Sequence, residues 1–533
     1  MARSYRPVDR EQSFLLPPDM RDWLPEGHLA WFVLEVVGQL DTSALHARHP
    51  KSGPGRQAYD PDMLLAVLLY AYAVGQRSSR AIERLCSTDV AFRVLCAQDV
   101  PDHTRLARFR QEHETVFADV FAQVLVLCAG AGMGRVGVVA IDGTKIAANA
   151  GLGANRGEAA LRRELAGMQQ AAKETVDGII AEASVVDQAE DAWLGTARGD
   201  ELAPQFADRA RRGTAVQRAL QAIEEQQAAQ AALSDEQAAR AEEYLRAVEA
   251  GTPPSSRPPT GVDPVRLEQA RLALAERRAA DMSNNRFRRS EARRKARVAR
   301  ERLAALAERD AAGGNDEGDA AIGEAKSDQA GGPADRVNVT DPDSRIMKTR
   351  NGWVQGYNAQ LAVSDDHLIL AVALTQDATD PGSFGPMMTA AVAAADRIQS
   401  CQPDPTRTGI GIVLADAGYF SEENLTLAGP DRLIACGTGR DMHREAVDHP
   451  ACGPAPDESN AKDAMRHRLR TAEAAKAYKR RGATVEPVNA HLKDGVGLRR
   501  FSRRGLPAAT SELNLAAAVV NLRKLYRRTY AIA

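Results

Sequence analysis

The sequence predicts a mixed α/β protein with an all-helical N-terminal region and a long helical insertion. Three observations favour this class. Helical patterns fill residues 1–125, apolar runs of strand length occur at 136–149 and again after residue 340, and residues 150–310 combine helical periodicity with abundant Ala, Glu, Gln and Arg. A chain of 533 residues is too long for one hydrophobic core, so we expect several domains.

Composition narrows the class of protein. Six cysteines occur without a C-x-x-C pair, which disfavours a zinc ribbon or a disulfide framework and favours a reducing cytoplasm. No apolar run has the length of a membrane span and the first residues lack an apolar signal segment, so we expect neither membrane insertion nor secretion. The net charge of −2 does not itself favour nucleic acid, but the clustering of basic residues does.

Residues 1–125 are predicted to form a helical, DNA-binding domain. A strongly apolar helix begins at Pro61, shorter amphipathic helices follow, and a further helix carries Arg105 and Arg108 near its start. Short helices followed by an Arg-rich one fit a helix-turn-helix-like unit. A helical bundle with a solvated basic face is the alternative, and these residues alone favour it slightly.

The insertion at 150–310 is predicted to be helical and coiled-coil-like, with its two longest helices near 206–250 and 263–310 forming a hairpin. Nine basic residues occur between Arg286 and Arg302, and they suit a solvated helix face and phosphate contacts equally well. Residues 311–338, rich in Gly, Ala and acids, are predicted to be a disordered linker.

The remaining segments, 136–149 and 340–500, are predicted to form one catalytic domain. Without the insertion, the elements follow in this order: a strand ending at Asp142, a hairpin of strands 353–363 and 367–375, a helix at 381–398, a strand ending at Asp416, a strand at 432–438, and helices carrying Glu486. This is the order of an RNase H-like fold, in which the first and fourth strands are neighbours. We therefore expect Asp142 and Asp416 to lie side by side, with residues 505–533 forming a C-terminal helix that packs on the core.

Each acid has a structural alternative. An Asp at a strand end caps the following turn about as often as it does chemistry, and Glu486 alone is better explained as a first-turn residue that satisfies the helix dipole. The helix of Glu486 is expected to restart after a break at Gly482, with Thr484 as its cap. Asp377 and Asp380 are interpreted as loop and N-cap residues before Pro381.

Together the acids indicate a metal site. Clustered carboxylates repel one another unless a cation holds them, and hard oxygen ligands select Mg²⁺ or Mn²⁺. Two such ions, roughly 3.5–4 Å apart, activate an attacking oxygen and stabilise the leaving oxygen in phosphodiester cleavage. Glu486 lies among basic residues and is the expected third ligand.

Several motifs carry a resemblance to a known family. They are YDPDMLLAVLLYAYAVGQRSSRAIERLC, PDHTRLARFR, IDGTKIAANA, DPDSRIMKTRNGWVQGYNAQLAV with TQDATD, LADAGYFSEEN, and YKRRGATVEPVNAHLK. The chain resembles DDE-type insertion-sequence transposases whose third acid lies in a Tyr…Arg…Glu…Lys signature. More closely, it resembles the eleven-eighty-two family of insertion sequences.

The resemblance implies that Asp142, Asp416 and Glu486 are the catalytic, metal-binding triad. It also implies that Tyr478, Arg481 and Lys493 contact the DNA backbone around the cut. Arg481 precedes Glu486 by five positions, where the signature usually has four. Further expected DNA contacts are Lys145, Lys348, Arg350, Arg503 and Arg504, for which ordinary surface bases are an equal alternative.

The implied activity is Mg²⁺-dependent hydrolysis at the ends of the element, followed by attack of the freed 3′-hydroxyl on target DNA. The expected partner is double-stranded DNA, as terminal inverted repeats and as target, bound by a homodimer at the bacterial nucleoid in the cytoplasm. Two alternatives stay open: an RNase H-like nuclease without strand transfer, and a non-catalytic DNA-binding protein derived from a transposase.

Overall fold

The computed structural model describes residues 19–47, 58–168, 170, 204–252, 258–259, 261–281, 286–311, 336–349, 352–401, 409–456 and 459–530. The chain divides into two compact units, Met1–Asn155 with Asn338–Ala533, and Arg156–Val337. In the described part of the chain, no single helix is long and apolar enough to cross a membrane. One bent pair of helices, His103–Glu112 with Val116–Gly130, meets that criterion by length and composition alone.

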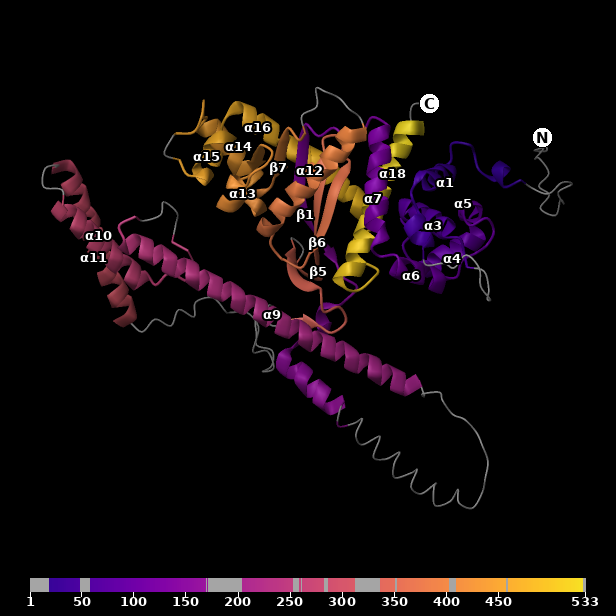
Figure 1. The fold of residues 1–533 in the computed structure, drawn as a ribbon, viewed down its shortest axis with the longest axis horizontal. Coiled ribbons are helices and arrows are strands. Elements are labelled where there is room, and N and C mark those ends of the chain that lie inside the picture. The colour runs from indigo at the N-terminus through magenta and orange to yellow at the C-terminus, as the bar shows by residue number, and fades with distance from the viewer. Residues whose placement is uncertain are drawn as a thin grey trace, which may run out of the picture. The chain divides into compact units, whose positions relative to one another are not determined.

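A mixed sheet forms the centre of the first unit (Figure 1). Its strands are β1 Val138–Ala147, β4 Arg345–Thr349, β5 Gly352–Ser364, β6 Ile369–Thr375, β7 Ile412–Ala415 and β8 Arg432–Ile434. They are ordered β4-β5-β1-β7-β8, with β6 also pairing with β5. β2 Asn155–Gly157 and β3 Arg336–Asn338 form a separate two-stranded sheet.

The register confirms the predicted RNase H-like layout. β1 runs parallel to β7, with Ile141 opposite Ala415, and antiparallel to β5, with Asp142 opposite Leu361. β5 and β6 form the predicted hairpin, and β8 extends the sheet beyond β7. The first and fourth strands of the fold are therefore neighbours, as the element order predicted.

Two strand predictions need correction. β1 does not end at Asp142 but continues to Ala147, because its second half still pairs with β5 and then with residues 499–501. The parallel pairing of β1 with β7 stops at Ile141, directly before Asp142. Asp142 therefore lies at the end of this pairing, although its own strand continues. β4 was also missed, because the two apolar residues of the short run Arg345–Thr349 are adjacent and do not alternate with polar ones as in a half-buried strand.

The N-terminal helices pack into one group, and α3 is its buried centre. They are α1 Leu29–Gln39, α2 Ser43–His46, α3 Pro61–Ala73, α4 Ser79–Thr88, α5 Val90–Leu95, α6 His103–Glu112 and α7 Val116–Gly130. α3 begins with Pro61 at its first position, where a missing N–H costs nothing, and the Asp60 side chain caps it. Nearly every residue of α3 is buried, which accounts for its apolar composition on all faces.

The C-terminal helix α18, Leu506–Tyr530, joins this group to the sheet. It packs against α7, α3 and β6, and Figure 1 shows α7 and α18 side by side. Glu512 of α18 is buried and accepts hydrogen bonds from Arg77 Nη1 at 2.7 Å and from the Ser502 backbone at 2.8 Å. The N-terminal helices and the sheet thus share one continuous hydrophobic core.

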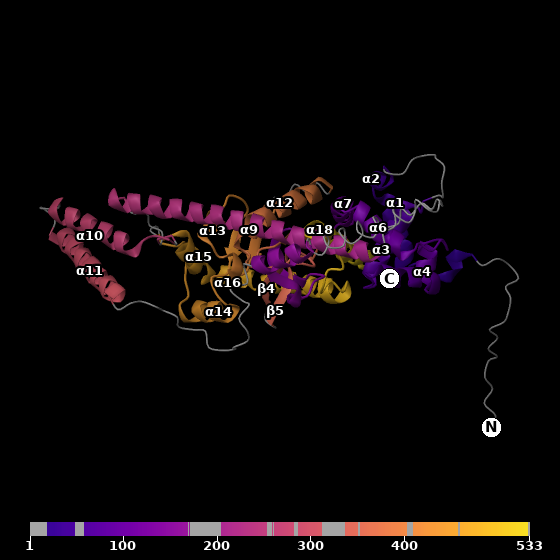
Figure 2. The same ribbon diagram turned by 90° about the horizontal axis from the view of Figure 1, so that it is seen from below.

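The other helices of the first unit are α12 Phe384–Cys401, α13 Glu422–Thr426, α14 Gly439–Asp448, α15 Ala461–Leu469, α16 Ala472–Tyr478 and α17 Arg480–Ala490, followed by a π-helical turn at His491–Gly495. Figures 1 and 2 both place the sheet between the N-terminal helices and the group α13–α16. The sheet therefore lies between two groups of helices that are far apart in the sequence.

The predicted start of the helix that carries Glu486 is wrong. Gly482 does not break the chain and Thr484 is not a cap: both lie inside α17, and Thr484 is buried. Pro487 lies in the helix interior, where it cannot donate to the carbonyl of Ala483. That carbonyl instead accepts a hydrogen bond from His367 Nε2 at 2.9 Å, which compensates for the missing backbone bond.

The second unit contains α9 Pro204–Glu249, α10 Pro264–Asp281 and α11 Arg286–Ala311. The segment predicted as one helix at 263–310 is two helices that pack against each other, and α9 contacts α10. Several basic residues of α11 are paired: Arg300 with Glu276 at 2.5 Å, and Arg302 with Glu268 at 3.3 Å. Residues 312–335 of the predicted linker lie outside the described residues.

Candidate active site at the β1–β7 edge

Asp142 and Asp416 occupy equivalent positions on neighbouring strands. Each directly follows a paired residue of the parallel β1–β7 ladder, Ile141 and Ala415, so the two carboxylates emerge at the same edge of the sheet. Asp416 Oδ1 also accepts a hydrogen bond from Gly418 N at 2.9 Å. Asp416 therefore does cap the following turn, and this cap uses one of its two carboxylate oxygens.

Burial makes ionisation of Asp142 costly. The side chain is 16% exposed, and its pKa is raised to about 6, first by loss of solvent and further by the nearby charges of Asp416 and Asp380. Arg481 acts in the opposite direction and lowers the pKa. An acid cluster with this electrostatic balance favours the binding of an additional cation.

Helix α17 supplies the groups that compensate Asp142 in this structure. Arg481 Nη1 lies 3.3 Å from Asp142 Oδ1, and Asn489 Nδ2 donates to Oδ2 at 2.9 Å. One helical face thus contacts both oxygens of the carboxylate. In the following π-helical turn, Lys493 Nζ donates to Thr144 Oγ1, two residues beyond Asp142 on β1. Sequence reasoning missed Asn489 and Thr144, because their contacts form only when α17 and the following π-helical turn pack against β1.

Tyr478 lies at the end of β7. Its hydroxyl donates to the carbonyl of Ala415 at 3.2 Å, directly before Asp416. Burial raises the pKa of Tyr478 to about 12, and Arg481 opposes that shift. Tyr478 and Arg481, which the resemblance assigned to one signature, therefore do lie together beside the acid pair.

Glu486 is the least integrated of the three predicted acids. Its side chain is exposed and makes no ion pair or hydrogen bond with the described residues. It lies back along its own helix, with Oε1 3.2 Å from the position that a Cβ on Gly482 would occupy. The structure thus brings Asp142 and Asp416 together but does not place Glu486 in contact with them.

A fourth acid, Asp380, lies at the same edge. It holds the N-cap position before Pro381, as predicted, but its side chain makes no capping hydrogen bond. Instead, Oδ1 accepts from Asn358 Nδ2 at 2.7 Å and Gln360 Nε2 at 2.9 Å, and Lys145 Nζ is 3.4 Å away. The predicted N-cap position of Asp380 is confirmed, but its side chain bonds to β5 and does not cap the helix.

The remaining residues that were predicted to contact DNA differ in their exposure and in whether they already pair with an acid. Arg108 and Lys348 are exposed, as is Arg504, whose Nε donates to Asn149 O at 3.2 Å. Arg105 is half-buried and lies 3.7 Å from Glu112, and Arg503 pairs with Glu114. Arg350 lies outside the described residues.

An open pocket of about 650 Å³ adjoins the acids. Its walls come from the end of β7 and from α14, α15, α16 and α17, and they include Asp416, Gly437, Thr438, Met442, His443, Leu469, Tyr478 and Arg481. The lining combines apolar side chains such as Met442 and Leu469 with the carboxylate of Asp416 and the guanidinium of Arg481. This arrangement provides room for a substrate beside Asp416.

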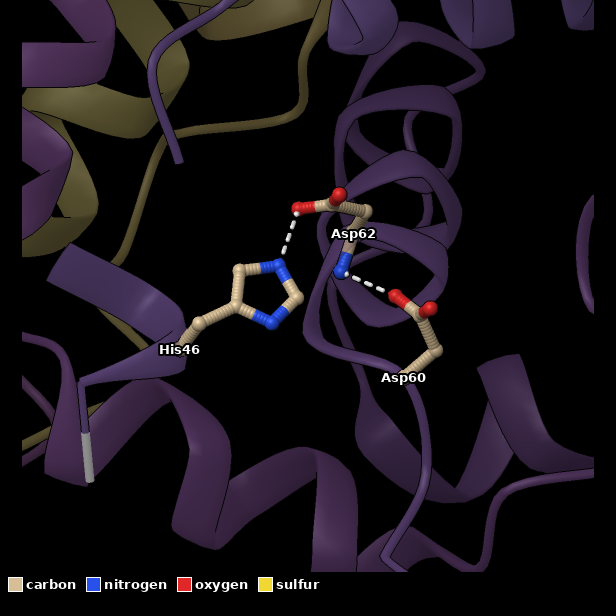
Figure 3. Close-up of side chains that lie close together, drawn as sticks. All are labelled: His46, Asp60 and Asp62. Atoms are coloured by element: carbon tan, nitrogen blue, oxygen red, sulfur yellow. Dashed lines mark hydrogen bonds and ion pairs between the residues drawn. The ribbon is translucent and has the colours of Figure 1, made fainter. Parts of the chain in front are cut away.

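The N-terminal helices contain a different group with metal-ligand chemistry. Among the described residues, His46, Asp60 and Asp62 are the three side chains of this type whose ligand atoms all lie within 4.8 Å of one another. Figure 3 shows that Asp60 accepts from the Asp62 backbone while His46 contacts the Asp62 carboxylate. Capping of α3 and one ion pair account for this arrangement.

The chain matches two family models. A model described as a transposase domain, DUF772, matches residues 18–112, and a model described as a transposase DDE domain matches residues 454–526. No curated protein and no solved structure matches the chain. The first match covers α1 to α6, and the second covers α15 to α17 and most of α18, with Tyr478, Arg481, Glu486 and Lys493.

The RNase H-like sheet, its acid pair and the two domain matches together support a transposase. More particularly, the matches support a DDE-type insertion-sequence transposase. Neither match is specific to the eleven-eighty-two family, so that narrower assignment stays a prediction. Transposases act on DNA, and DDE domains use divalent metal ions.

The residues present fit such an ion. The donor set consists of carboxylate oxygens, which are the ligands that Mg²⁺ and Mn²⁺ prefer. Burial makes the charge of Asp142 costly, the carboxylates of Asp416 and Asp380 add to that cost, and Arg481 offsets only part of it, since the pKa of Asp142 stays raised. A divalent cation would relieve that charge.

Proposed function

We propose that the chain cleaves DNA at the ends of its insertion sequence by metal-dependent hydrolysis and joins the freed 3′-hydroxyl ends to target DNA. One observation carries this proposal: Asp142 and Asp416 adjoin at the end of the β1–β7 pairing, beside basic groups from the helices that match the DDE domain. The carboxylates supply a metal site, and the basic groups supply charge for a phosphate backbone.

We assign Asp142, Asp416 and Glu486 as the residues that hold Mg²⁺ or Mn²⁺. Two ions in such a site make the attacking oxygen nucleophilic and stabilise the leaving oxygen. Glu486 is exposed on α17, on the helix that already contacts Asp142 through Arg481 and Asn489.

The reaction needs no covalent protein intermediate. Water attacks a phosphorus at the element's end, the P–O bond to the 3′-oxygen breaks, and the 3′-hydroxyl is released. That hydroxyl then attacks a target phosphodiester, so that one P–O bond replaces another. Arg481 and Lys493 bind the phosphates near the cut, while Tyr478 fixes the end of β7 through the Ala415 carbonyl.

Further DNA contacts are assigned to exposed basic residues, namely Lys348, Arg350, Arg108 and Arg504. Lys145 and Arg105 belong to this set only where DNA displaces their acidic partners, Asp380 and Glu112. We leave Arg503 out, because its guanidinium already pairs with Glu114 and donates to the carbonyl of Arg110. The N-terminal helices bind the terminal inverted repeats. A homodimer holds the two ends of the element together, and the protein acts at the bacterial nucleoid.

The experiment is a cleavage assay on DNA that carries both ends of the element, with Mg²⁺ present. Asp416→Asn should lower the cleavage rate by roughly a thousandfold or more, because it removes one carboxylate charge from the metal site. Glu422→Gln is the matched control, because Glu422 is an exposed first-turn acid of α13 only six residues away. Cleavage by Asp416→Asn at the wild-type rate would exclude the proposed site.

The same assay separates the alternatives. Wild-type protein that cuts the ends but never joins them to target DNA would favour an RNase H-like nuclease. Wild-type protein that binds the ends without cutting would favour a non-catalytic DNA-binding protein.

A further inference from the structure

We propose that Asp380 is a fourth carboxylate of the metal site, held in place by two buried amides of β5 and presented to Asp416. This inference rests on the proposed function, because it extends the ligand set of the same site. It concerns a residue that the sequence pattern assigned to a helix start, and it is carried by contacts between β1, β5 and the turn after β7.

One oxygen of Asp380 is fully used for anchoring. Asn358 and Gln360 are both completely buried, and each donates its amide to Oδ1. Gln360 is oriented in turn, because its Oε1 accepts a hydrogen bond from the buried hydroxyl of Tyr419. Together with Lys145, three donors converge on Oδ1. Such a network fixes the rotamer of Asp380 and leaves its second oxygen as the available one.

The second oxygen faces the Asp416 turn. An added Cβ on Gly418 would lie 3.0 Å from Asp416 Oδ1 and 3.1 Å from Asp380 Oδ2. The two carboxylate oxygens are therefore at most 6.1 Å apart, the sum of the 3.0 Å and 3.1 Å distances, with the small Gly418 beside them. Asp380 and Asp416 thus present oxygens to the same glycine.

Gly143 allows this approach. It follows Asp142 on β1, and an added Cβ there would lie only 2.6 Å from Asp380 Oδ1 and 2.6 Å from Gln360 Nε2. The absence of a side chain at Gly143 is what lets Asp380 reach strand β1 beside the first acid.

A buried acceptor at the same place supports a cation. Asn358 Oδ1 has no hydrogen-bond partner among the described residues, although the side chain is completely buried. The orientation of this amide is determined, because Nδ2 faces two acceptors, Asp380 Oδ1 and the carbonyl of Asp377. Oδ1 therefore points to the Gly143 position, where a Cβ would meet it at 3.2 Å. An unsatisfied buried oxygen beside clustered carboxylates indicates an ion or an ordered water.

The competing explanation is that Asp380 only neutralises Lys145 and braces the loop before α12. Substitution by Asn separates the two. An Asn side chain retains an oxygen for the three donors on Oδ1, so the anchoring network survives. It removes the negative charge and replaces Oδ2 with an amide that cannot bind a cation.

The test is a Mn²⁺ titration of the metal-free, full-length protein, with free Mn²⁺ measured by electron paramagnetic resonance. Asp380→Asn should weaken Mn²⁺ binding by about tenfold or more, the scale found for groups that support a metal site. Asp416→Asn should weaken it as well. Asp377→Asn is the matched control, because Asp377 is exposed in the same loop, and it should bind as the wild type does.

Wild-type affinity in Asp380→Asn, with weakened binding in Asp416→Asn, would show that Asp380 is only structural and overturn the inference. Weakened Mn²⁺ binding in Asp380→Asn but not in Asp416→Asn would also overturn the inference, because Asp380 and Asp416 would then not bind the same ion. Wild-type affinity in both Asp142→Asn and Asp416→Asn counts against the proposed function itself. Should Asp380→Asn fail to fold, Gly418→Ala places a methyl group beside both carboxylate oxygens, and wild-type Mn²⁺ affinity of that variant would reject the inference.

Discussion

Arg481 Nη1 lies 3.3 Å from Asp142 Oδ1, and this contact joins the helix of the DDE domain match to the first strand of the sheet. The two residues are separated by 338 intervening positions that include the whole second unit. In the absence of a metal ion, the guanidinium provides part of the positive charge that the acid pair requires. We expect the same guanidinium to contact a phosphate when DNA binds.

Arg481→Gln should therefore weaken DNA binding and reduce its salt dependence. Loss of one phosphate contact lowers the slope of log K against log salt by about 1 and acts almost uniformly across sequences. Fluorescence anisotropy with labelled end DNA at several salt concentrations measures both quantities. Arg480→Gln is the matched control, because Arg480 is adjacent but pairs with Asp365. Equal effects of the two substitutions would contradict a specific role of Arg481.

The pKa of Asp142 predicts a pH dependence of stability. Because the folded-state pKa is raised from 3.8 to about 6, the stabilising contribution is fully present below pH 3.8 and is lost as pH rises through 6. The loss is on the order of 2–3 kcal/mol, since each pH unit between the two pKa values is worth about 1.4 kcal/mol.

Chemical denaturation of metal-free wild type and Asp142→Asn between pH 3.5 and about 7.5 measures this contribution. The stability of the wild type relative to the variant should decrease with rising pH and become constant above about pH 7. A relative stability that increases over this range would mean that Asp142 ionises more readily in the folded protein.

The buried pair of Arg77 and Glu512 should be important for stability. The Glu512 side chain is 1% exposed, and removal of one partner leaves a buried charge unpaired. Arg77→Met should lower the free energy of unfolding by about 3–5 kcal/mol. The exposed pair of Arg444 and Asp441 provides the comparison, and Arg444→Gln should cost less than about 1 kcal/mol. Urea unfolding measures both, and similar costs would exclude a special role of the buried pair.

Substitution of Glu486 should lower the cleavage activity but leave the stability of the fold almost unchanged. Its side chain is exposed and makes no hydrogen bond with the described residues, so Glu486→Gln should change the free energy of unfolding by less than about 0.5 kcal/mol. Cleavage of end DNA should nevertheless fall by roughly a hundredfold or more, because the third metal ligand is lost. Activity close to that of the wild type would remove Glu486 from the triad.

The sheet order could be predicted from the sequence, because apolar strand-length runs and turn residues mark β1, β5, β6 and β7. The adjacency of Asp142 and Asp416 followed from that order alone. Asp380 could not be found in this way, because an Asp before Pro381 fits a helix start equally well. Its role depends on Asn358 and Gln360, whose burial is visible only once β5 pairs with β1.

Local signals also misplaced one helix. Gly482 and Pro487 usually mark a break and a first turn, but packing of α17 on β1 and the His367 hydrogen bond to Ala483 O keep the helix continuous. Tertiary contacts overrode the local preference at the element that carries Arg481, Glu486 and Asn489.

The most direct test of a metal site at Asp416 is a change of metal specificity. A thiolate binds Mg²⁺ poorly and softer ions better, so Asp416→Cys should lose end cleavage in Mg²⁺ and regain it in Mn²⁺. Rates of DNA cleavage by wild type and Asp416→Cys in each metal decide the matter. Recovery in Mn²⁺ would show direct coordination by residue 416, whereas wild-type cleavage by Asp416→Cys in Mg²⁺ would contradict the account.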